Sequence, residues 1–180
     1  MADNMIKIVE LDKESYNGKK FTLRYVTKGY YDIELTKKGF DISYKNFGET
    51  KEMSFGDVFF NEWLDEPIAF GAFDGEKLLG YVEGTLEKWN NRYRISNICV
   101  FDDSNRQKGI GTLLMDCILK EANKRNARMV VLETQTCNEY AISFYKKHGF
   151  RIIGFDLFAY TNTDLERHEV RIEMGKMLDV

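Results

Sequence analysis

The sequence has 180 residues and a formal net charge of -3, and hydrophobic residues make up 43% of it. That length and balance suit one globular domain with a single core, so we expect one domain over residues 1–180. The slightly acidic composition offers no basic face to nucleic acid. Three widely spaced cysteines and two histidines form no disulfide or metal-ligand pattern, so no metal is expected.

The chain carries no feature of a membrane or exported protein in its sequence. No apolar run approaches the roughly 20 residues that a membrane span needs. The first residues are polar and acidic, unlike a signal peptide. A cytoplasmic location without membrane contact is therefore the expectation.

Residues 20–55 alternate aromatic and polar side chains, a period-2 pattern that predicts strands. Ser54 or Asp57 could then cap a short helix through Phe59, Phe60 and Trp63, ending before Pro67. Three further strands are predicted at 68–73, 78–86 and 93–100. The turn signals Asp74-Gly75 and Asn90-Asn91 separate them, so the three form an antiparallel meander.

After the meander the period of the apolar residues changes to that of a helix. Apolar residues at 110, 113, 114, 117 and 118 mark one helix face. The run at 129–132 predicts a buried strand, and 141–145 a short helix that ends at Gly149. Two strands, 152–160 and 170–174, close the chain. This order predicts an α/β (α+β) fold with a mixed, mostly antiparallel twisted sheet flanked by helices.

A glycine-containing turn joins the third meander strand to the long helix. Such a turn presents backbone N–H groups and the positive helix end to an anion, and two cations lie within it. It lacks the Ser or Thr of a Walker loop and the third glycine of a dinucleotide fingerprint. A pyrophosphate cradle and an ordinary glycine-rich loop both fit these residues, which are Arg106, Gln107, Lys108, Gly109, Ile110, Gly111 and Thr112.

The turn's Arg-x-x-Gly-x-Gly pattern resembles the acetyl-CoA motif of the GCN5-related N-acetyltransferase (GNAT) superfamily. Residues 132–150, with Asn138, Ala141, Phe144-Tyr145 and Gly149-Phe150, resemble its second signature. The resemblance covers residues 68–160 and implies a single-domain acetyl-CoA-dependent N-acetyltransferase, with residues 1–66 on the acceptor side. Pairing of edge strands into a homodimer is a further family expectation.

A narrower resemblance points to streptothricin acetyltransferases, which acetylate an amine of that antibiotic. It rests on residues 89–93, 132–135 and 156–160. It implies a small cationic acceptor and a role in antibiotic resistance. Six acidic residues of the first half could attract such a cation or could be solvated surface: Glu49, Glu52, Asp57, Glu62, Asp65 and Glu66.

The resemblance also assigns roles to particular residues. Tyr145 matches the general-acid tyrosine that protonates the leaving thiolate, although it could also be a packing residue. The coenzyme is expected to contact the turn and, further, Ile98, Cys99, Val100, Asn138, Ala141, Phe144 and Tyr145. The backbone N–H groups of residues 98–100 are expected to polarise the thioester carbonyl, where that strand splays from its neighbour.

The general base is less evident, because Ser96-Asn97 stands where many relatives carry a glutamate. Glu83 and Glu133 are the candidates, acting directly or through water, and Glu133 could also bind substrate. Trp63, Trp89 and Tyr93 could line the acceptor pocket by cation–π contact, or belong to a helical or sheet core. Three functions fit: acetylation of a small primary amine, non-catalytic acyl-CoA binding, and protein N-acetylation.

Overall fold

The structure is a computed structural model that describes residues 6–106 and 108–179. The chain packs as two compact units. The first unit takes the residues up to Leu23, Gly56–Val131 and the end from Met177, and the second takes Arg24–Phe55 and Leu132–Lys176. Each is described by itself, and the expectation of one domain stays a prediction. Within the described ranges, no helix is both long and apolar enough to span a membrane.

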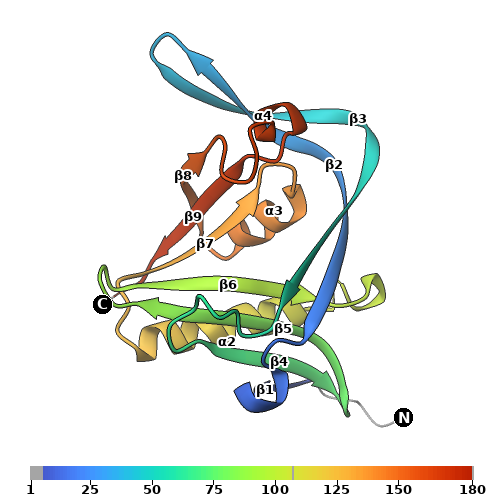
Figure 1. Cartoon of the computed structure of the whole chain (residues 1–180), viewed down its shortest axis with the longest axis vertical. Helices are drawn as coiled ribbons and strands as arrows, with labels where there is room; N and C mark the ends of the chain where they lie inside the picture. Colours follow the sequence, from blue (N-terminus) through green and yellow to red (C-terminus); the bar gives the residue numbers. More distant parts are fainter. Residues whose placement is uncertain (1–5, 107, 180) are drawn as a thin grey trace. The chain divides into compact units, whose positions relative to one another are not determined.

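The first unit is built on an antiparallel set of strands, labelled in Figure 1. Its neighbours run in the order β1 (Lys7–Glu10), β4 (Ile68–Asp74), β5 (Lys77–Glu87) and β6 (Arg92–Val100). The meander predicted from the alternating pattern is thereby confirmed, while β1 was not predicted.

The β4–β5 turn lies one residue later than predicted. Asp74 pairs with Lys77, so the central residues are Gly75 and Glu76 rather than Asp74 and Gly75. Gly75 has a φ of 59°, and Glu76 is not in the left-handed region. The two central residues therefore do not both have the positive φ that a type I′ turn needs.

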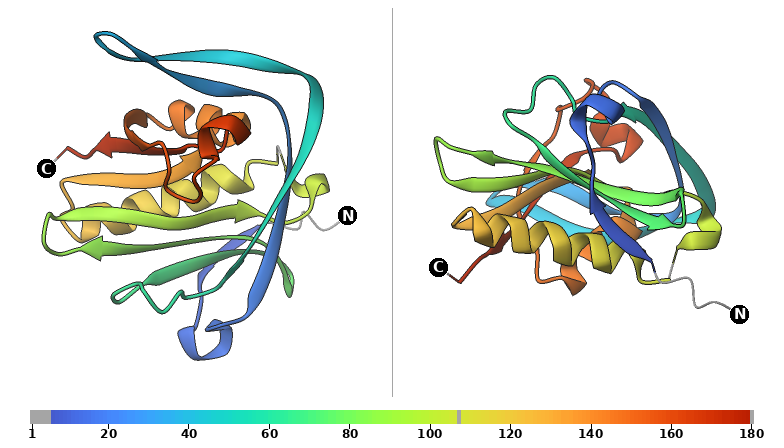
Figure 2. Two further views of the ribbon diagram at one scale, coloured as in Figure 1. Left: turned by 45° about the horizontal axis from the view of Figure 1, so that its top comes forward. Right: turned by 90° about the horizontal axis from the view of Figure 1, so that it is seen from below.

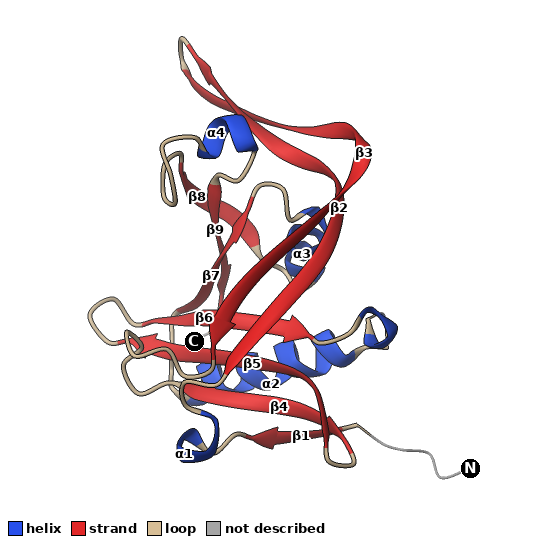
Figure 3. Cartoon of the chain, turned by 45° about the vertical axis from the view of Figure 1, so that its right-hand side comes forward, coloured by secondary structure: helices blue, strands red, loops and turns tan. Residues whose placement is uncertain are grey.

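Helix α2 (Ile110–Lys124) packs against β4, β5 and β6, and the right-hand view of Figure 2 shows it lying along the strands. The predicted helix is confirmed, but its buried face is shifted. Leu113 is 42% exposed and Cys117 only half-buried, whereas Met115 and Ala122 are buried. The short helix α1 (Lys13–Tyr16), drawn in blue in Figure 3, begins after Asp12, whose carboxylate accepts from Ser15 N at 2.9 Å.

The helix predicted between Ser54 and Pro67 is wrong. Strand β3 (Gly39–Val58) runs through its first half, and residues 59–66 form bends and a turn. Phe59 and Phe60 are both buried, and Phe60 has a φ of 55° that no α-helix tolerates. The ring of Phe59 lies 4.4 Å from that of Tyr81, so aromatic packing decides the local conformation.

Strands β2 (Lys20–Thr36) and β3 pair as a long two-stranded ribbon, which confirms the strands expected over residues 20–55. Both strands lie largely within the second unit. There Lys45 of β3 forms ion pairs with Asp32, at 2.5 Å, and with Glu34, both on β2.

The rest of the second unit begins in β7 (Met129–Gln135) and continues through α3 (Glu139–Lys147), β8 (Arg151–Asp156), α4 (Asp164–Arg167) and β9 (Arg171–Met177). Strand β9 lies between β7 and β8. Gly149, with a φ of 87°, follows α3 as predicted. The strand predicted over 152–160 ends at Asp156, because the next residues turn.

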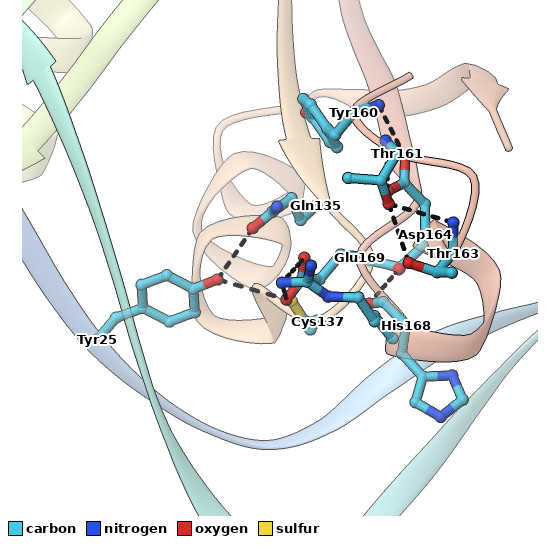
Figure 4. A network of polar contacts seen from close by, with 11 residues as sticks. Tyr25, Gln135, Cys137, Tyr160, Thr161, Thr163, Asp164, His168 and Glu169 are labelled. Atoms are coloured by element: carbon cyan, nitrogen blue, oxygen red, sulfur yellow. Dashed lines mark hydrogen bonds and ion pairs between the residues drawn. The ribbon is translucent and has the colours of Figure 1, made fainter. Parts of the chain in front are cut away.

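That turn is held by a buried carboxylate, shown in Figure 4. Asp164 accepts from Tyr160 N at 2.8 Å and from the Thr161 nitrogen and hydroxyl at 2.9 and 2.6 Å. The three bonds fold residues 160–164 back on the start of α4, which explains why the chain leaves β8 early.

Candidate active site

The glycine turn lies in the first unit, between the 3-10 helix η1 (Asp103–Asn105) and α2. Asn105 is buried and donates to Phe101 O at 3.2 Å. Lys108 Nζ lies 3.2 Å from Asn105 Oδ1. One buried amide thus ties the lysine of the turn to the end of the preceding strand.

Gly109 is the N-cap of α2, with φ of 81° and ψ of -2°, and forms no side-chain cap. The first N–H groups of a helix have no carbonyl partner within it, and here they belong to Ile110, Gly111 and Thr112. Together with the positive helix end they fit an anionic group. Gln107 lies outside the described residues, and Arg106 is half-buried with interactions of its own.

The three β6 residues expected at the thioester pair with β5. Ile98 faces Val82, Cys99 faces Tyr81 and Val100 faces Gly80. Cys99 is buried, which raises the pKa of its thiol and makes it a poor nucleophile. The expected splay of this strand and its free amides stay predictions.

Glu83 is the clearest chemical feature of the first unit. Its side chain is fully buried on β5, two residues after Tyr81 and on the same face of the strand. Oε2 accepts from Phe60 N at 3.0 Å, while Oε1 has no hydrogen-bond partner among the described residues. Burial, aided by the charge of Asp57, raises the pKa of Glu83 from its ordinary value of 4.5 to about 7. A carboxyl group so tuned can exchange a proton near neutral pH.

A β-bulge gives Glu83 its neighbours on β6. The β5–β6 register shifts between Glu83 and Gly84, so that Glu83 faces Asn97 whereas Gly84 faces Ile95. Ser96 is the extra residue, and its hydroxyl donates to Glu83 O at 3.2 Å. A Cβ on Gly84 would stand 2.6 Å from the Tyr93 ring, so only glycine fits beside the bulge. Asn97, at the position where the resemblance led us to look for a glutamate, thus faces the carboxylate of the neighbouring strand.

A cavity of ≈ 420 Å³ opens beside the segment that donates to Glu83. Trp63, one of the lining residues, is 65% exposed. A hydrogen bond of 3.0 Å from Gly18 N to Phe59 O connects the two chain segments that line the cavity. Its lining residues are Asn17, Gly18, Val58, Phe60, Asn61, Glu62 and Trp63.

In the second unit, Asn138 acts as the N-cap of α3. Its Oδ1 accepts from Ala141 N at 3.3 Å, so both residues have a structural role at the helix start. Tyr145 is 7% exposed and packs near Phe144 and Phe150, with ring centroids 5.7 and 6.1 Å away. The helix places Tyr145 on its buried face, as its spacing predicted.

Glu133 is placed very differently from Glu83. Strand β7 is buried from Met129 to Leu132, but the side chain of Glu133 is 43% exposed. It lies 3.6 Å from Arg171, whose other nitrogen lies 3.5 Å from Asp156. An exposed, ion-paired carboxylate is a weaker candidate for the base than a buried one.

The two aromatic candidates of the β5–β6 hairpin also differ in how far they are buried. Trp89 is 84% exposed, with the Arg92 guanidinium 6.0 Å from its ring, whereas Tyr93 is 1% exposed and belongs to the core. Two of the six acidic residues that could attract a cationic acceptor are neutralised by an ion pair, since Lys88 pairs with Asp65 and Glu66 at 3.2 and 2.9 Å.

Sequence reasoning missed a polar cluster in the second unit, seen in Figure 4. The Tyr25 hydroxyl donates to Gln135 Oε1 at 3.3 Å and lies 3.6 Å from Cys137 Sγ. Burial raises the pKa of both the Tyr25 phenol and the Cys137 thiol. The partners are more than a hundred residues apart, and an aromatic residue in a period-2 strand carries no signal of such a contact.

Known acetyltransferases resemble this chain in sequence and in fold. Residues 36–150 match the model of the acetyltransferase (GNAT) family. A streptothricin acetyltransferase of Escherichia coli is 31% identical over 137 residues, covering 76% of this chain and 75% of the relative. The crystal structure of nourseothricin acetyltransferase has a TM-score of 0.75 at 22% identity, over 97% of this chain and 99% of that one. This likeness shows the same fold, a mostly antiparallel sheet flanked by helices.

A Bacillus anthracis protein solved in complex with acetyl coenzyme A is also similar. Its TM-score is 0.72 at 25% identity, over 98% of this chain and 99% of that chain.

Proposed function

Because the chain belongs to the acetyltransferase (GNAT) family, we propose that its acceptor is a primary amine of a small polycationic molecule of the streptothricin class. The chain is an acetyl-CoA-dependent N-acetyltransferase. Two observations support the acceptor: the similarity to a streptothricin acetyltransferase over three quarters of both chains, and the buried carboxyl of Glu83. A cationic amine needs such a proton acceptor, since its pKa is about 10.4.

The coenzyme's pyrophosphate is proposed to bind at the glycine turn. Lys108 supplies positive charge, Gly109 keeps the cap free of a side chain, and the first N–H groups of α2 donate. Gly109 adopts its left-handed backbone conformation without strain, whereas a residue with a side chain would be strained at this position.

Glu83 and Tyr145 are proposed to handle the protons. Glu83, as carboxylate, takes a proton from the acceptor's ammonium group, and the freed nitrogen bonds to the acetyl carbon while the carbon–sulfur bond breaks. Tyr145 protonates the departing thiolate. The nitrogen then loses its second proton, which restores the Tyr145 hydroxyl, and Glu83 releases the first proton to solvent. The products are the acetamide, free coenzyme A thiol and one proton. Glu83 carries this proposal because it is buried, has a pKa raised to about 7, and keeps one oxygen without a hydrogen-bond partner among the described residues.

The test is an acetylation assay with purified protein, acetyl-CoA and four acceptors: streptothricin, spermidine, free lysine and a peptide with a free N-terminus. Thiol release and the mass of the product are both measured. Streptothricin is expected to gain one acetyl group with the highest kcat/KM of the four. The Glu83→Gln protein is the matched control, with binding intact and thiol release slowed by about 10²- to 10⁴-fold.

Two results would contradict the proposal. Acetylation of the peptide alone would make the chain a protein N-acetyltransferase. Tight coenzyme A binding without thiol release for any acceptor would make it a binding module.

A further inference from the structure

Asp57, at the end of β3, holds a carboxyl group surrounded by N–H donors. Oδ1 accepts from Val58 N and from the Asn61 side-chain nitrogen, both at 2.8 Å. Oδ2 accepts from the Asn97 side-chain nitrogen at 2.9 Å. A carboxylate is acceptor-only, so three donors fix its position.

The bond between Asp57 and Asn61 closes the segment that contains Phe60. Phe60 is buried and has a φ of 55°, a conformation that is strained for a residue other than glycine. In that conformation its N–H donates to Glu83. Asp57 therefore anchors the residue that orients the Glu83 carboxyl.

Asn97 links the two carboxyl groups from the other side. It faces Glu83 across the β5–β6 ladder and donates to Asp57. Residues that face each other in a ladder project from the same side of the sheet, so Glu83 and Asn97 share one face, and the hydrogen bond from Asn97 holds Asp57 on that side.

The charges around Glu83 favour its protonated form. The ionisable groups that act on it are Asp57 on β3, Tyr81 on its own strand and Tyr93 on β6. The negative charge of Asp57 raises the pKa of Glu83, in addition to the larger effect of burial. A stronger base results, and the two carboxyl groups together attract a cation.

We propose that Asp57 is a positioning residue of the acceptor site, which acts through Glu83 by fixing the Phe60 segment and by placing a second negative charge beside the base. This inference rests on the proposed function. The proton still passes from the acceptor's ammonium group to Glu83, and Asp57 exchanges none.

The test is the Asp57→Asn variant, which keeps the side-chain shape and removes the charge. The titration of Glu83 is followed by NMR in protein labelled at the glutamate carboxyl carbons, with Glu83→Gln identifying its signal. The midpoint is expected to move to lower pH in Asp57→Asn, and the acid limb of kcat/KM to move with it. A loss of kcat/KM on the order of tenfold is expected, smaller than that of removing the base itself.

Asp116→Asn is the matched control, because Asp116 is exposed on α2 and belongs to none of the candidate sites. It should change neither the midpoint nor kcat/KM. An unchanged Glu83 midpoint in folded Asp57→Asn would overturn the inference. If that variant does not fold, Asn97→Ala removes a donor from Asp57 and should move the midpoint to higher pH, and an unchanged midpoint would again overturn it. The titration needs no acceptor, so it separates failure of this inference from failure of the proposed function.

Discussion

Oε2 of Glu83 lies 3.0 Å from the backbone nitrogen of Phe60, while Oε1 has no hydrogen-bond partner among the described residues. One oxygen is oriented by a buried main-chain donor and the other is left for a proton or a substrate. Burial of a polar atom without a partner is costly, and such atoms recur at functional sites.

Replacing Glu83 with Gln keeps the side-chain volume and removes the base. The expected result is a fall in kcat/KM of about 10²- to 10⁴-fold, the usual contribution of a general base. Glu133→Gln is the matched control, because Glu133 is exposed and paired with Arg171. Steady-state kinetics that place the large loss in Glu133→Gln would reverse the assignment.

Glu83 also predicts how stability varies with pH. Its folded pKa of about 7 lies above the ordinary value of 4.5, so the folded state binds its proton more tightly than the unfolded state. That stabilisation is complete below about pH 4.5 and is lost as the pH rises through 7. The wild type should therefore lose stability relative to Glu83→Gln between pH 5 and 8, by up to about 3 kcal/mol. Urea unfolding at both pH values measures this, and a parallel pH response of the two proteins would contradict it.

Gly109→Ala tests the cradle at the start of α2. A side chain at a φ of 81° is strained, so a loss of stability of about 1–2 kcal/mol and a higher KM for acetyl-CoA are expected. Gly154→Ala is the control, since its Cβ would meet nothing within 4 Å and its backbone is not left-handed. Equal KM values for acetyl-CoA in both variants would argue against binding at the turn.

Tyr145→Phe removes the hydroxyl and keeps the packing of the ring. If Tyr145 is the general acid, kcat should fall by about 10²-fold or more, with little change in the dissociation constant of acetyl-CoA. Tyr140→Phe, on the same helix and 53% exposed, should behave as wild type. An unchanged kcat in Tyr145→Phe would remove that residue from the mechanism.

Much of the fold followed from local patterns. The meander and α2 were predictable because period-2 and period-3.6 spacing reflect which face is buried. The segment 54–66 was not, because the packing of Phe59 on Tyr81 and the left-handed Phe60 override a helix-like spacing. Tertiary contacts of that kind leave no trace in neighbouring residues.

The candidate site divides in the same way. The glycine turn could be found because backbone geometry demands glycine at Gly109. Glu83 could be named as a candidate, but its burial depends on β5 being covered on both faces. Asp57 looked like a helix cap or a rim charge, because its partner Asn97 is 40 residues away in the sequence. Long-range pairing, rather than residue type, gives it a role.

The pH dependence of kcat/KM tests the central claim, that Glu83 is the base, most directly. With streptothricin as acceptor, the wild type should lose activity as the pH falls below about 7, because Glu83 then becomes protonated. In Glu83→Gln the residual activity should have no such acid limb. An acid limb near pH 7 that persists in Glu83→Gln would show that another group accepts the proton.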